Sequence, residues 1–219
     1  MSTKVDPSGG IQRLTTLADG VFAIVMTLLI LDLRVPSLPS DVNDAVLNHQ
    51  LRAILPNFAS FILSFVLTGI YWVGHHVQFL FIRRTERTHI WINLFFLLTI
   101  AIIPFSAAVL GKFGLHLLPV MWYGGNILLA AFGLQMSWLY ATKGNRLVDR
   151  DLDRAVVRRV NERLVFAYIS YGVAMLLALV NPRISLVMYL VLPVFFIVPG
   201  ALDRHWVGHR ATHNQPLSD

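Results

Sequence analysis

Long apolar stretches separated by short polar segments form the main pattern along this chain. Five stretches contain no Asp, Glu, Lys or Arg: 53–82, 88–111, 113–142, 164–182 and 184–202. A sixth apolar stretch, 13–34, is bounded by arginines and interrupted by Asp19 and Asp32. A membrane-spanning helix needs about 20 mainly apolar residues. The pattern therefore predicts six spanning helices, at about 13–34, 53–82, 88–111, 117–141, 164–181 and 184–202.

Prolines and charges refine these boundaries. Pro104 is expected to kink the third helix, and Asn181-Pro182 separates the last two. The charged segment 143–163 repeats Arg at spacing i+4, which favours a helix that runs into the fifth span. No second domain is indicated. We expect a six-helix membrane domain at 13–204, flanked by tails at 1–12 and 205–219.

Composition supports an all-α polytopic membrane protein. Hydrophobic residues make up 56% of the 219, charged residues only 14%, and the mean hydropathy is +0.63. Soluble domains are about 25% charged. The chain has no cysteine, which excludes a disulfide framework, a thiolate metal site and cysteine catalysis. Its net charge of +6 is explained by basic loops rather than by nucleic-acid binding.

The distribution of Lys and Arg predicts the orientation. With six spans, 14 of these residues fall on the side that holds both termini and 4 on the other side. Basic loops are retained in the cytoplasm. We therefore expect a multi-pass protein of the cell membrane with both termini cytoplasmic.

The first predicted helix contains acidic residues within its span, and ionisable groups there are costly and usually functional. At about 100° per residue its positions 13, 17, 20, 24, 27 and 31 share one face, with spacings 4-3-4-3-4. In mid-membrane, Ile24 and Leu31 of this seam and the adjacent Leu28 are bulky and apolar. Thr27 supplies the one hydroxyl among them. Copies arranged around an axis would form a narrow pore gated by dewetting. Ordinary helix packing remains an equally plain interpretation of the periodicity.

A polar stripe marks the second predicted helix. It comprises Asn57, Ser60, Ser64, Thr68, Tyr71 and His75. Asp19 needs a partner in a low dielectric, and Arg13, His75 or Asn93 of the third helix could provide one. We favour a hydrogen-bonded brace for the first helix over a proton relay.

Several motifs resemble the lysosomal potassium channel family of transmembrane protein 175. The family's first-helix pattern is Arg-x-x-x-Phe-Ser-Asp followed by a small residue and an aliphatic run. This chain has Arg13, Leu17, Ala18, Asp19 and then Gly20, so Leu replaces Phe and Ala replaces Ser. The segments 71–76 (YWVGHH), 91–93 (WIN) and 104–105 (PF) also look similar. The bacterial members of the family are single-repeat proteins with six helices.

The resemblance implies a homotetrameric, potassium-permeable channel whose first helices line a central pore and conduct passively. The constriction is then expected at Ile24, Leu28 and Leu31, and the potassium preference at Thr27. A brace for the pore helix is expected from Arg13, Asp19, His75 and Asn93. The permeant potassium ions and the lipid bilayer are the expected partners. No cofactor is implied.

Two other classes were weighed. A proton-coupled carrier or proton leak would use Asp19 and His75, but carriers usually have internal repeats, and none is found. An intramembrane enzyme with a histidine site is less favoured, because the spans offer one His75-His76 pair and no P-loop. His205, His209 and His213 repeat at i+4 and are a weak metal candidate. We therefore expect a channel and not an enzyme.

Overall fold

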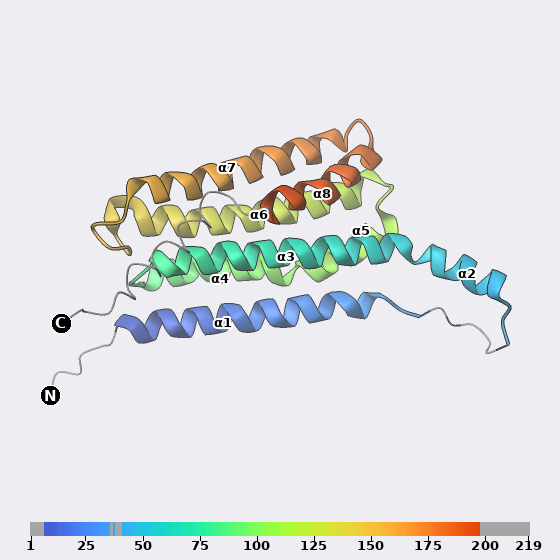
Figure 1. Cartoon of the computed structure of the whole chain (residues 1–219), viewed down its shortest axis with the longest axis horizontal. Coiled ribbons are helices and arrows are strands. Elements are labelled where there is room, and N and C mark those ends of the chain that lie inside the picture. The colour runs from blue at the N-terminus through green and yellow to red at the C-terminus, as the bar shows by residue number, and fades with distance from the viewer. Residues whose placement is uncertain (1–6, 36, 38–40, 198–219) are drawn as a thin grey trace, which may run out of the picture.

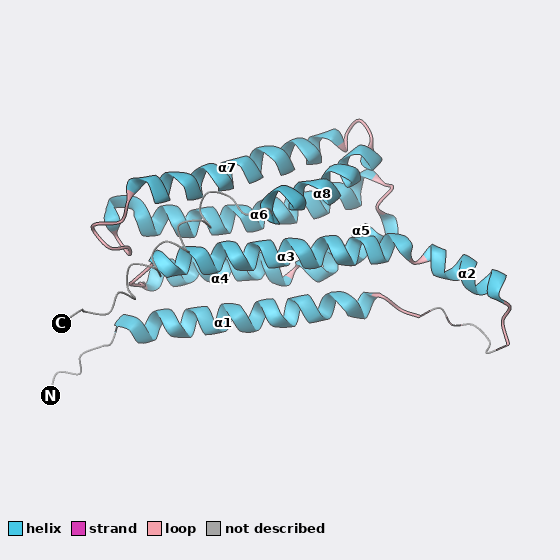
Figure 2. Ribbon diagram, in the orientation of Figure 1, coloured by secondary structure: helices cyan, strands magenta, loops and turns pink. Residues whose placement is uncertain are grey.

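The computed structural model describes residues 7–35, 37 and 41–197, and this part of the chain is helical apart from loops and turns (Figure 2). Its helices are α1 (Pro7–Leu28), η1 (Leu29–Asp32), α2 (Asp44–Ala53), α3 (Leu55–Phe81), α4 (Arg87–Ala101), α5 (Ile103–Phe113), α6 (Leu117–Thr142), η2 (Lys143–Asn145), α7 (Arg154–Leu177) and α8 (Pro182–Ile197). The long helices run side by side in an up-and-down bundle, with α1 along one edge and α7 along the opposite edge (Figure 1). The predicted all-α class is confirmed.

Four helical stretches are long and apolar enough to cross a membrane. They are Gly9–Asp32, Leu55–Phe81, Arg87–Phe113 and Leu117–Asn145, and they match the first four predicted helices closely. The fifth predicted helix belongs to α7, which begins in the charged segment at Arg154, as the arginine spacing indicated. The sixth corresponds to α8, and the end predicted at 202 lies outside the described residues.

The third predicted helix is kinked, as Pro104 led us to expect. The kink falls at Ile102, between α4 and α5. Proline lacks an N–H and its ring collides with the preceding turn, so the regular hydrogen bonding of the helix is interrupted there. In contrast, α2 was not predicted. It begins where the side chain of Asn43 accepts a hydrogen bond from the amide of Val46, 2.9 Å away, and it has no buried residue.

The core lies between α4 and α6, where the two backbones approach closely. A Cβ added to Gly133 of α6 would stand 3.0 Å from Cα of Phe96 on α4, so only glycine permits this approach without displacement. Phe96 and Ile100 of α4 and Tyr123 and Trp138 of α6 are completely buried. Among the described helices α4 and α6 are the most extensively packed pair, and α1 packs against α4 from outside.

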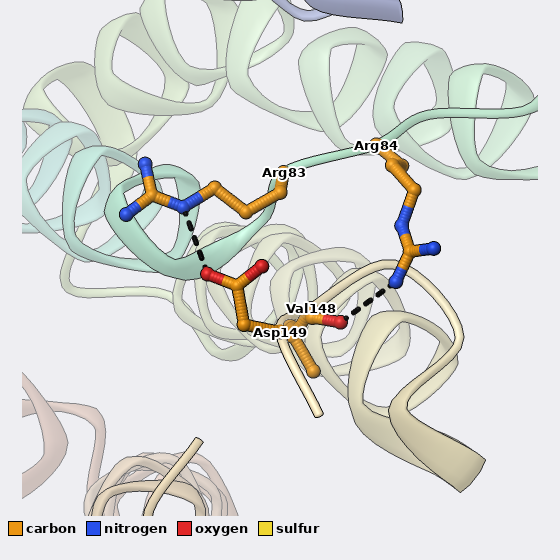
Figure 3. A network of polar contacts seen from close by, with 4 residues as sticks. All are labelled: Arg83, Arg84, Val148 and Asp149. Carbon is orange, nitrogen blue, oxygen red and sulfur yellow. Dashed lines mark hydrogen bonds and ion pairs between the residues drawn. The ribbon is translucent and has the colours of Figure 1, made fainter. Parts of the chain in front are cut away.

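Two loops meet at the end of the bundle that holds most of the arginines (Figure 3). Arg83 forms an ion pair with Asp149 at 3.2 Å, and Arg84 donates to the carbonyl of Val148 at 3.0 Å. The ion pair is exposed and contributes little by itself. Val148 is fully buried, however, and Ile82 pairs with it in a short antiparallel bridge. The loop after α3 and the loop before α7 are therefore joined.

Candidate pore-lining helix and its buried support

Two faces of α1 have opposite surroundings. Leu14, Ala18, Phe22, Val25 and Leu29 are buried against the rest of the chain. Their spacing of 4-4-3-4 is that of a packed helix face. This face holds α1 against the other helices, and it includes Ala18, which stands where the family pattern has Ser.

The predicted seam lies on the other face, and no other part of the described chain covers it. The exposed fractions are 47% for Leu17, 60% for Ile24, 44% for Leu28 and 67% for Leu31. Arg13 is also exposed at the start of this face. The structure therefore brings the seam residues together on one surface and leaves that surface available to lipid or to other copies of the chain.

Thr27 lies on this exposed surface with its hydroxyl turned back to its own helix. Its Oγ1 stands 3.0 Å from the carbonyl oxygen of Ala23 and 2.8 Å from that of Ile24. A hydroxyl has one proton to donate and two lone pairs that accept. Because the proton is used on the backbone, the oxygen can offer only its lone pairs outward, which suits a cation.

Asp19 receives a hydrogen bond that the sequence reasoning missed. The indole Nε1 of Trp72 on α3 donates to Oδ1 of Asp19 at 2.9 Å. Trp72 also stacks on His76, with ring centroids 5.5 Å apart. The partner of Asp19 is thus an α3 indole, rather than Arg13, His75 or Asn93, the groups named as candidates. A bond of this type, to a carboxylate, is stronger than a neutral one.

His75 and Asn93 are brought together, in a buried network larger than predicted. His75 Nε2 donates to Oδ1 of Asn93 at 3.2 Å, and Nδ2 of Asn93 donates to the carbonyl of His89 at 2.9 Å. Nε2 of His89 lies 3.1 Å from Nδ2 of Asn93 and 3.0 Å from Oγ of Ser137, both of which can donate. Neutral His89 therefore carries its proton on Nδ1, which donates to Oγ1 of Thr85 at 3.1 Å.

This network is coupled to α1 through an aromatic contact. The His75 ring is stacked on Phe96, with centroids 5.6 Å apart and an interplanar angle of 9°. It also packs at 6.4 Å against Phe22, on the buried face of α1. His75 thus supports α1 by packing, whereas Trp72 does so by hydrogen bonding to Asp19.

One sequence signal could have revealed part of this network. His89 precedes Asn93 by four residues, so a helix places both on one face. No group of three or more metal-ligating side chains occurs within the described ranges. The histidines at His205, His209 and His213 lie outside them.

The fold and this site define a polytopic helical membrane protein whose first helix presents an uncovered apolar seam. Residues 13–104 match the family model of the endosomal/lysosomal potassium channel TMEM175. A potassium channel of Streptomyces collinus is 30% identical over 189 residues, which is 84% of this chain and 90% of that protein. The chain therefore belongs to the TMEM175 family.

Two further comparisons bear on the site. The crystal structure of a lysosomal potassium-selective channel TMEM175 homolog from Chamaesiphon minutus superposes with a TM-score of 0.75 and 26% identity, covering 86% of this chain and 96% of that one. The human endosomal/lysosomal proton channel TMEM175 is 40% identical over 82 residues, but these are 35% of this chain and only 16% of that protein. The two relatives differ in the ion that their names give.

Proposed function

We propose that the protein is a potassium-permeable cation channel of the cell membrane, in which four subunits each contribute α1 to a central pore. The chain spans nearly the whole length of a relative named a potassium channel, at 30% identity. The observation that supports α1 as the pore helix is its uncovered seam, 60% exposed at Ile24 and 67% at Leu31, on a helix otherwise packed into its subunit. Six spans with both termini cytoplasmic complete the proposal, in keeping with the bias of basic residues.

In the proposed pore, Ile24, Leu28 and Leu31 form successive apolar rings that resist wetting. A narrow apolar constriction gates by expelling water. Thr27 lies between the first two of these rings and supplies oxygen lone pairs to a partly dehydrated cation. Selectivity for potassium over sodium then depends on this hydroxyl oxygen.

The brace acts outside the constriction. We place Arg13 and Asp19 at the cytoplasmic entrance, with Asp19 held by Trp72. His75 and Asn93, together with His89, position the helix through Phe22. This extends the predicted brace of Arg13, Asp19, His75 and Asn93 by Trp72 and His89.

A proton pathway is the second candidate, and one observation favours it. Two buried imidazoles, His75 and His89, lie on either side of Asn93. Histidine can take up and release protons, but the amide of Asn93 has no proton to relay, so this candidate needs water to carry the proton past Asn93. A human relative over part of the chain is named a proton channel.

Flux from liposomes containing the purified protein tests the channel. We expect potassium efflux down its gradient, without a coupled substrate, and a smaller sodium flux under matched conditions. A pH-sensitive dye in the same vesicles measures proton movement. Equal potassium fluxes with and without protein would refute the proposal, and proton movement without potassium movement would favour the second candidate.

Ile24→Asn tests the constriction specifically. The amide should wet the apolar ring and raise conductance at an unchanged number of assembled channels. Ile169→Asn on α7 is the matched control, because Ile169 is 62% exposed and Ile24 60%, and both changes place the same amide on an exposed helix face. Equal currents in the two variants and the wild type would contradict a gate at Ile24.

A further inference from the structure

A groove beside α3 touches the proposed channel machinery only at Trp72, whose indole donates to Asp19 of α1. It has a volume of about 1000 Å³, and its walls are α3 and α7, with α6 at the floor. Phe196 near the end of α8 lines it as well. Most of the wall is apolar, with Val66, Ile70, Val73 and Val77 on α3 facing Leu164 and Ala167 on α7.

The length of the groove suits a lipid chain. Its α3 wall runs from Val66 to Phe81, about 22 Å at about 1.5 Å per residue. One leaflet of the hydrocarbon core is about 15 Å deep, half of the whole. An acyl chain can therefore lie along the apolar wall while its head remains at the groove's polar end.

That polar end carries two arginines on successive turns of α7. Arg159 and Arg163 both line the groove. None of the ion pairs among the described residues involves either of them, and Arg163 donates to the carbonyl of Phe196. The carboxylate that lines the groove, Asp153, caps α7 by accepting from the amide of Ala155 at 2.8 Å. Two guanidinium groups a turn apart suit a phosphate.

The contacts of α6 place the two arginines beside the end of the α3 wall. Nε2 of Gln78 on α3 donates to the carbonyl of Leu134 at 3.1 Å. The next α6 residue, Gln135, donates to Asn161 of α7 at 2.9 Å. Gln78 therefore lies level with Asn161, between the turns of Arg159 and Arg163 and near the Phe81 end of the apolar wall.

From this arrangement we propose that the groove binds one anionic glycerophospholipid. Its phosphate lies between Arg159 and Arg163, and an acyl chain fills the apolar wall. The lipid belongs to the leaflet at the arginine-rich end of the bundle. Lipid binding at the two arginines does not require that α1 conducts.

Native mass spectrometry of the full-length protein in detergent tests the site, with phosphatidylglycerol and phosphatidylcholine as probes. We expect one tightly held phosphatidylglycerol per subunit and about tenfold weaker binding in the R159Q/R163Q variant. The matched control is R154Q/R158Q, which removes the same charge from the same helix but from the hollow on its other side. The control should keep its lipid.

Ala167→Trp fills the apolar wall without changing charge and should also displace the lipid, while thermal unfolding and assembly remain near wild type. Equal lipid retention in the wild type and R159Q/R163Q would overturn the proposal. It would also fail if R154Q/R158Q lost as much lipid, or if inorganic phosphate bound as tightly as phosphatidylglycerol. Loss of assembly in Ala167→Trp with no lipid bound to the wild type would assign the groove to a neighbouring subunit instead.

Discussion

Asn93→Leu should destabilise the protein clearly more than Asn126→Leu, another polar-to-apolar change in its core. Leucine nearly preserves the shape of the side chain, so the effect isolates the amide. The change removes the acceptor for His75, at 3.2 Å, and the donor to the carbonyl of His89, at 2.9 Å. All three residues are at most 4% exposed, so water cannot replace these partners.

The magnitude follows from two contributions. A polar contact between membrane helices contributes about 0.6 kcal/mol on average and up to about 1.7. A buried donor left unsatisfied costs about 1–3 kcal/mol, and the imidazole N–H of His75 is left in that state. Together these predict a loss of about 2–4 kcal/mol in the free energy of unfolding. For a chain of this size that corresponds to about 4–16 °C in unfolding temperature.

Asn126→Leu is the matched control. Asn126 is also buried, 6% exposed, but its amide donates a single hydrogen bond, to Oγ of Ser106 at 3.1 Å. Its replacement should cost about 1 kcal/mol. Thermal unfolding of both variants in one detergent measures the difference. If Asn126→Leu lowered the unfolding temperature as much as Asn93→Leu, the reasoning from the network would be refuted.

Three further variants test other parts of the structure. Thr27→Ala should shift the reversal potential towards poorer discrimination of potassium from sodium, whereas Thr27→Ser should not, and an unchanged potential in both would remove the selectivity role. Gly133→Ala should lower the free energy of unfolding by about 1–3 kcal/mol, because the added Cβ overpacks against α4. Gly125→Ala is the control and should be neutral or stabilising, because its added Cβ meets nothing within 4 Å. A lower unfolding temperature for Gly125→Ala than for Gly133→Ala would contradict the close approach of α4 and α6. Trp72→Phe removes the donor to Asp19 but keeps an aromatic ring, so hydrogen–deuterium exchange around Asp19 should accelerate, and unchanged exchange would show that the bond does not hold α1.

The helices and the seam were accessible from sequence because both depend on local periodicity. Membrane spans must be long and apolar, and a period near 3.6 assigns residues to faces. The break near Pro104 follows from backbone chemistry in the same way. The short α2 has a capping Asn43 that could have indicated it, but its exposed, weakly apolar residues gave no periodic signal.

The site residues that were missed depend on contacts between helices. Trp72 was noted only as part of a motif, and nothing in its local sequence indicates that its indole reaches Asp19. Ser137 joins the network from α6, 44 residues beyond Asn93, and single-sequence patterns carry no information on such pairs. That His75 and Asn93 belong to one brace was expected, since antiparallel neighbours place groups of equal depth side by side, but their hydrogen bond to each other was not.

The support of α1 is confined to one of its faces, and this has a consequence for assembly. Of the four apolar spans, Gly9–Asp32 is the least buried within the chain, at 28%, against 56% for Leu117–Asn145. Lipid is as apolar as the seam, so burial alone provides no force to bring together the four seams of the proposed tetramer. Assembly of that tetramer must then come from close packing and polar contacts, and the exposed polar groups of α1 include Arg13 and Asp19, next to the small residue Gly20. In the proposed channel, contacts between subunits are therefore expected to be strongest at the end of α1 where these residues lie, which would leave the proposed apolar rings farther along the helix free to wet and dewet.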